Sequence, residues 1–147
     1  MYKHLLVATD GSKLSGKAVT HAIALAQALS AKLTAFYASP DYPTPAFTDG
    51  VVYDPVSRKE YAALATKEAQ KILDAVKTKA EAGGVECATM HVIAAAPWEA
   101  IVAASRKAKC DAVVMASHGR RGITAVLLGS ETQKVLAHTK LPVFVVR

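Results

Sequence analysis

The chain has 147 residues and carries 18 Lys and Arg against 12 Asp and Glu, a formal net charge of +6. Hydrophobic residues make up 52% of it and charged residues 20%, a composition that supports a folded core and excludes a disordered tail. The length predicts a single domain over residues 1–147, because domains commonly span about 100–200 residues. The basic residues are scattered along the chain, so we do not expect a nucleic-acid partner.

Membrane spans, targeting segments and disulfides are not expected either. No apolar stretch reaches the ~20 residues that a membrane span needs, and the N-terminus meets the acidic Asp10 too early for a signal peptide. The two cysteines, Cys87 and Cys110, lie far apart and lack metal-binding spacing. They are typical of small core residues in a reducing compartment, which indicates a cytoplasmic protein.

Apolar runs and helical stripes alternate from the N-terminus onward. A strand is predicted over His4–Ala8, followed by a helix whose apolar stripe runs over residues 14–29 and for which Ser12 is a suitable N-cap. Residues 32–38 predict a second strand. Residues 39–57 hold four of the six prolines and predict a long loop.

A long helix is predicted next, from about Arg58 to Ala82, where Gly83 and Gly84 end it. Its apolar side is expected to consist of Leu64, Ile72, Leu73 and Val76. The rest of the chain repeats the alternation, with strands predicted over residues 87–93, 111–116 and 141–146 and helices over 98–108 and 129–138.

Five strands and four helices in alternation predict a doubly wound α/β fold with a parallel sheet and helices on both faces. Ligands of such sheets bind beyond the carboxyl ends of the strands, where the strand order reverses. The candidate site is therefore expected in the segments that follow the first, second and fourth strands: residues 9–12, residues from 39 onward, and residues 117–128.

The segment after the fourth strand is the most unusual part of the sequence. Gly119 permits backbone shapes closed to other residues, so that amide groups can turn inward on an anion. Gly129 and Ser130 stand at a predicted helix N-terminus, where free amides and the helix dipole favour phosphate. Arg120 and Arg121 would add positive charge. Spacing alone is equally compatible with an ordinary glycine-containing loop and a serine N-cap.

A rival phosphate motif begins at Gly11, where the sequence fits the GxxxxGK pattern of the P-loop. Ala18 occupies the position of the Ser or Thr that would hold magnesium. The helical stripe also places Gly16 and Lys17 inside a helix and not in a loop. We therefore interpret this match as chance.

Signatures of other enzymes are missing from the sequence. There is no GxGxxG after the first strand, no GxSxG elbow, and no metal-ligand spacing among the five histidines. His118 alone lies in the candidate loop, where we expect it to shape the backbone. The residues thus predict a binding site without a dedicated reaction.

At these residues the sequence resembles the universal stress protein family, over its whole length. ATP-binding members carry G-x2-G-x9-G-(S/T), and here Gly119 is followed with the same spacing by Gly129 and Ser130. Ala116 stands where the family usually has glycine, and alanine disfavours positive φ. The resemblance implies a Rossmann-like fold with strand order 3-2-1-4-5, a homodimer and a role in stress survival.

The resemblance also implies ATP, with Mg²⁺, as the ligand. Asp10 would contact the ribose or the magnesium-phosphate region, and Ala38 would hold the adenine through its backbone. The other residues expected around the nucleotide are Ala8, Thr9, Met115, Ala116, Gly119, Arg120, Gly129, Ser130, Glu131 and Thr132.

These observations favour an ATP-binding regulatory protein. A weak ATPase that uses the same pocket, and a family member that binds no nucleotide and acts through protein contacts, remain alternatives. The last strand is apolar at consecutive positions and is expected at the sheet edge, which predicts pairing with a second copy of the chain. The sequence does not identify a downstream partner.

Overall fold

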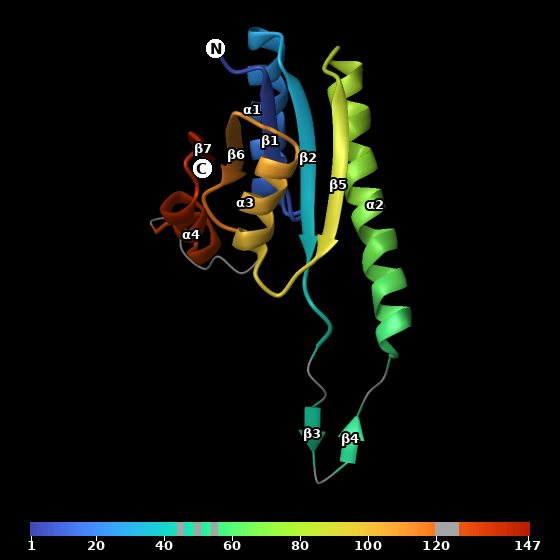
Figure 1. Cartoon of the computed structure of the whole chain (residues 1–147). Helices are drawn as coiled ribbons and strands as arrows, with labels where there is room; N and C mark the ends of the chain where they lie inside the picture. The colour runs from blue at the N-terminus through green and yellow to red at the C-terminus, as the bar shows by residue number, and fades with distance from the viewer. Residues whose placement is uncertain (44–45, 49–50, 54–55, 120–126) are drawn as a thin grey trace.

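The computed structural model describes residues 1–43, 46–48, 51–53, 56–119 and 127–147. Its strands and helices alternate as expected along most of the chain (Figure 1). The strands are β1 (His4–Ala8), β2 (Lys32–Ser39), β3 (Ala46–Thr48), β4 (Val51–Tyr53), β5 (Cys87–Ile93), β6 (Ala112–Ala116) and β7 (Val143–Val146). The helices are α1 (Lys13–Leu29), α2 (Arg58–Ala82), α3 (Pro97–Lys107) and α4 (Ser130–His138).

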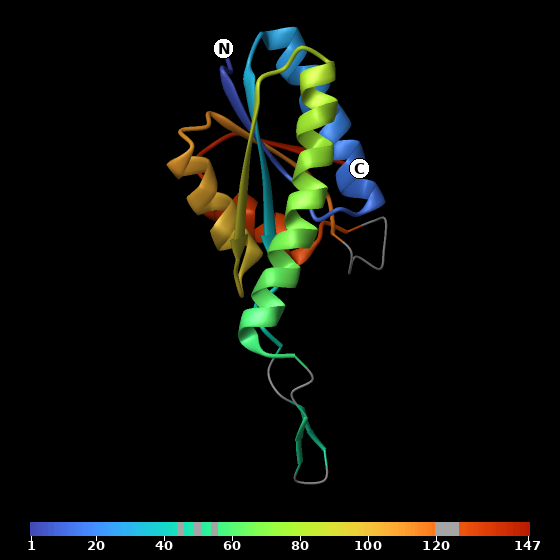
Figure 2. The same cartoon turned by 90° about the vertical axis from the view of Figure 1, so that its right-hand side faces the viewer.

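Five parallel strands form the main sheet in the order β5-β2-β1-β6-β7. Numbered by their succession in the chain, these strands have the order 3-2-1-4-5, which confirms the predicted doubly wound fold. Helices α1 and α2 cover one face of the sheet, and α3 and α4 cover the other (Figure 2). The strand order reverses between β1 and β6, so the topological switch point lies at their carboxyl ends.

Neighbouring residues of the central strands belong to two different cores. Leu5 and Val7 of β1 pack into the cluster that α1 and α2 share, whereas Leu6 packs into the cluster of α3 and α4. Strand side chains alternate between faces, so a strand covered on both sides must be apolar at consecutive positions. Each such buried side chain contributes about 1.5–3 kcal/mol relative to an exposed one.

Two expectations about the middle of the chain are corrected. The segment predicted as a loop contains a short antiparallel hairpin, β3–β4. Leu64 is 61% exposed, although it was expected on the buried side of its helix. The reason is that α2 begins beyond the end of the sheet, next to the hairpin, and its buried stripe starts only at Ala69 (Figure 1).

Both cysteines are buried, as their sequence context predicted. Burial raises the pKa of the Cys110 thiol to about 11 and also raises the pKa of Cys87, so both thiols stay protonated at neutral pH. No helix in the described part of the chain combines the length and apolar character that a membrane crossing requires.

Candidate functional site

The turn between β1 and α1 satisfies its own backbone amides. Thr9 Oγ1 accepts from the Gly11 amide at 3.2 Å, and Asp10 Oδ1 accepts from the Ser12 amide at 2.9 Å. Ser12 is the N-cap of α1, as predicted, and its hydroxyl accepts from the Ser15 amide at 3.2 Å. Side chains of the turn itself thus occupy the donors that an anion would need.

The same region shows that the GxxxxGK match does not form a P-loop. Gly16 and Lys17 lie inside α1, and the Gly16 amide donates to the Ser12 carbonyl at 2.9 Å. A P-loop needs these residues in an open loop that wraps phosphate. The match to GxxxxGK is therefore a chance one.

The N-terminus of α4 is built differently. Gly129 is its N-cap and supplies no side chain, while the Gly129 amide donates to the Ser117 carbonyl at 2.7 Å. The buried Thr132 hydroxyl lies within hydrogen-bonding distance of the Ala116 and Ser117 carbonyls, at 3.0 and 3.1 Å. These bonds fix α4 to the end of β6. Ser130 is the first helical residue and not the cap that spacing alone allowed.

Each of the other helices receives a side-chain acceptor at its N-terminus. Ser12 caps α1, and Ser57 caps α2 in a capping box with Glu60. The carboxylate of Glu131 on α4 accepts from the Trp98 amide in the first turn of α3, at 2.8 Å. Among the helices of the described residues, α4 is therefore the one for which no described side chain accepts from the N-terminal amides.

The segment that follows β6 approaches the turn between β1 and α1 at Gly119. A Cβ added there would lie 2.8 Å from Asp10 Oδ2, so the Asp10 carboxylate lies directly against this residue. The φ of Gly119 does not lie in the left-handed region. At Gly129 a Cβ would lie 3.0 Å from the Cα of His118 and 3.2 Å from the Ser117 carbonyl oxygen, so Gly129 packs on the two residues that follow β6.

The residues expected around the nucleotide gather at the carboxyl ends of β1, β2 and β6 and at the start of α4. These residues differ in their exposure to solvent. Thr9, Met115, Ala116 and Thr132 are buried, whereas Ala8, Asp10, Ala38, Gly119, Gly129, Ser130 and Glu131 are partly or fully exposed. Arg120 lies outside the described residues.

Ala116 ends β6 with strand backbone, paired with Val146. Its φ is not positive, so alanine is accommodated there without backbone strain. Ala38 is the penultimate residue of β2 and pairs with Val92 of β5. It also packs against the core cluster that contains Ile101.

Sequence reasoning missed two residues that shape this edge. Ser15 supports the first turn through a 3.0 Å hydrogen bond to Thr9 Oγ1, and Trp98 binds Glu131 through its amide. The position of Ser15 among the apolar residues of its helix is a signal that could have identified it as a hydrogen-bond partner for the preceding turn. Nothing local to Trp98 indicates its partner, which lies 33 residues further along the chain.

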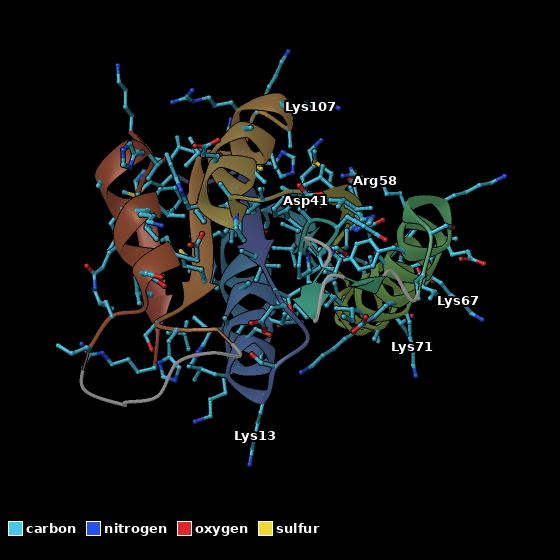
Figure 3. The ribbon with its side chains drawn as sticks, turned by 90° about the horizontal axis from the view of Figure 1, so that it is seen from below. Lys13, Asp41, Arg58, Lys67, Lys71 and Lys107 are labelled. Carbon is cyan, nitrogen blue, oxygen red and sulfur yellow. The ribbon has the colours of Figure 1, made fainter. Side chains whose placement is uncertain are left out.

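Figure 3 looks onto the carboxyl edge from below. Lys13 points outward from the first turn of α1, and Lys67 and Lys71 point outward from α2, whereas Arg58 lies near Asp41 with its guanidinium over the Tyr42 ring. These basic side chains do not converge on one point. The described residues also contain no group of three or more His, Cys, Asp or Glu that could hold a metal ion by itself.

The sheet order defines a doubly wound α/β protein in which α4 begins beside the carboxyl end of β6. The model of the universal stress protein family matches residues 1–147, and the chain belongs to that family. It is similar to the universal stress protein MJ0531 of Methanocaldococcus jannaschii, with 32% identity over 147 residues that cover 100% of this chain and 83% of the relative.

Two solved structures are similar to the whole chain. Protein MJ0577 superimposes with a TM-score of 0.81 at 24% identity, covering 99% of this chain and 96% of the other, which supports the fold. A universal stress protein solved in complex with cAMP has a TM-score of 0.71 at 29% identity, covering 99% and 97%.

Proposed function

We propose that the chain binds ATP with Mg²⁺ at the carboxyl edge of the sheet and serves as a nucleotide-dependent regulator in stress survival, without a dedicated reaction. The observation that carries this proposal is the N-terminus of α4, which has no side-chain acceptor of its own and follows a glycine-containing segment beside Asp10. Free amides at a helix N-terminus bind phosphate oxygens, and the helix dipole adds attraction.

The residues present fit a magnesium nucleotide. The amides of Ser130 and its neighbours would hold phosphates, and the Ser130 hydroxyl, which is exposed, would donate a further hydrogen bond. Asp10 brings a carboxylate next to Gly119, and carboxylate oxygen is the ligand that Mg²⁺ prefers. The partly exposed backbone at Ala38 would contact the base. Bound ATP would supply the anionic phosphates that these groups recognise.

A cyclic nucleotide is the second candidate ligand, because a family member that is 29% identical was solved with cAMP. The cyclic phosphate carries one negative charge and coordinates Mg²⁺ poorly compared with a triphosphate. The two candidates therefore differ in their dependence on magnesium.

Calorimetric titration with ATP, cAMP, GTP and NAD, each with Mg²⁺ and with EDTA, tests the proposal. We expect ATP to bind best and only with Mg²⁺. In Asp10→Asn the amide oxygen can still accept from the Ser12 amide, so the turn before α1 is kept, while ATP should lose the affinity that it gains from Mg²⁺. Binding of cAMP without ATP would replace the proposal by the second candidate. If none of the four nucleotides binds, the result would favour the alternative that this chain is a family member that binds no nucleotide and acts through protein contacts.

Nucleotide turnover is measured on the same samples. Chromatography of the bound nucleotide after several hours would show whether ATP becomes ADP. We expect intact ATP. Conversion to ADP by the wild type but not by Asp10→Asn would support the weak ATPase.

We also propose that the chain forms a homodimer through β7. This strand is last in the sheet order, and its four residues are only half-buried although they are all apolar. An apolar edge strand invites pairing, and a second copy would cover it symmetrically. Light scattering at micromolar concentration should give twice the chain mass, and Val145→Lys should lower it. A mass near 15.5 kDa for the wild type would contradict the dimer.

A further inference from the structure

Glu131 is a carboxylate in the first turn of the helix that we propose to bind phosphate. Its two oxygens have different partners. Oε2 accepts from the Trp98 amide at 2.8 Å, and Oε1 lies 3.5 Å from Lys134 Nζ. The negative charge is thus held toward α3 and balanced by a lysine.

Helix α3 depends on this contact for its N-terminal cap. Its N-cap residue, Ala96, offers no side-chain acceptor, and Pro97 occupies the first turn. Glu131 satisfies an amide that the sequence around α3 leaves without a side-chain partner. A carboxylate at this position also interacts favourably with the dipole of α3.

Trp98 contacts α4 a second time. Its ring contacts the ring of His138, in the last turn of α4, with 4.4 Å between ring centroids and the ring planes tilted by 37°. The ring also packs against the core cluster that contains Ile101 and Val135. The first turn of α3 is therefore attached to both ends of α4, through Glu131 and through His138.

We propose that Glu131 is a positioning residue that couples the first turn of α4 to Trp98 and directs its own charge away from the bound phosphates. This inference rests on the proposed nucleotide site. A ligand that draws on the amides of α4 shifts or tightens its first turn, and the Glu131 carboxylate carries that change to the amide of Trp98. Nucleotide binding then alters the environment of the indole.

Trp98 is the single tryptophan of the chain, so emission excited at wavelengths that tyrosine does not absorb reports on it alone. The experiment combines this emission with calorimetric titration of Mg-ATP for the wild type, Glu131→Gln and Glu131→Asp. Glutamine keeps the length and an acceptor oxygen but removes the charge. Aspartate keeps the charge but is one methylene too short to hold the 2.8 Å contact.

For the wild type we expect binding heat together with a change in Trp98 emission. Glu131→Gln should keep the emission change. Glu131→Asp should bind Mg-ATP roughly two- to fivefold more weakly, because its carboxylate is released near the phosphates, and should lose the emission change. Lys134→Ala is the matched control: it removes the partner of Oε1, leaves the Trp98 contact, and should retain the emission change.

Two results would overturn the coupling alone: binding heat without any emission change in the wild type, or an undiminished emission change in Glu131→Asp. Absence of binding heat for the wild type would overturn the proposed nucleotide site and the coupling with it. The two failures are therefore distinguishable.

Discussion

Two turns at the carboxyl edge of the sheet carry the same dipeptide, Gly11-Ser12 directly before α1 and Gly129-Ser130 at the start of α4. In the first turn the serine is the N-cap and its hydroxyl accepts from the backbone of Ser15. In the second turn the glycine is the N-cap, and the serine is the first helical residue. A shift of one residue in the helix start thus decides whether the serine caps the helix or is left for a ligand.

The surroundings of the two turns reinforce this difference. Thr9 and Asp10 accept from the amides of Gly11 and Ser12 in the first turn, so these two amides are already occupied. Thr132, in the second turn, directs its hydroxyl to the strand carbonyls behind it, so it fixes the helix without occupying the helix amides. A helix N-terminus is therefore an anion site only where nearby side chains do not already occupy it.

The largest effect is expected for Ser130→Ala. Loss of a hydrogen bond to a charged phosphate, worth about 1.5–3 kcal/mol, should weaken ATP binding roughly ten- to a hundredfold. The free energy of unfolding should change by less than about 0.5 kcal/mol, because Ser130 is exposed and does not cap α4. Calorimetry and urea unfolding measure the two quantities. Ser130→Thr, which keeps the hydroxyl, is the control, and unchanged affinity in Ser130→Ala would place the phosphates elsewhere.

Thr132→Val is expected to act on stability first. Valine has nearly the same shape but cannot donate to the carbonyls of Ala116 and Ser117, so the free energy of unfolding should fall by about 1–3 kcal/mol. Urea unfolding with an unchanged m-value would show it. In Thr132→Ser the hydroxyl remains, and a smaller loss is expected. A Thr132→Val protein as stable as the wild type would show that these bonds do not hold α4 to β6.

The smallest effect is expected for Ser12→Ala, which removes the cap of α1. The free energy of unfolding should fall by about 1 kcal/mol. In Ser12→Gly it should fall by only about a few tenths of a kcal/mol. Binding of ATP should stay at the wild-type level in both variants. If Ser12→Ala weakened ATP binding as strongly as Ser130→Ala, the contrast between the two turns would be wrong and the first turn would belong to the site.

Local signals in the sequence were sufficient for most elements. The strand His4–Ala8, the cap Ser12 and the helix Arg58–Ala82 occur as predicted, because apolar periodicity and capping chemistry act over a few residues. Leu64 was misplaced because periodicity shows which side of a helix is apolar but not how far the sheet beneath it extends. The strands β3 and β4 were missed because three-residue strands give too short a pattern.

The sequence by itself determined the alternation of strands and helices and the strands that are apolar at consecutive positions, and hence the doubly wound fold. It also determined the spacing of glycine and serine at the start of α4. Only the tertiary structure decided that Gly119 lies against Asp10, and that Glu131 faces Trp98. Both depend on contacts between segments far apart in the chain. Spacing in a sequence constrains a helix or a turn, whereas the partner of a carboxylate is set by which elements the sheet brings together.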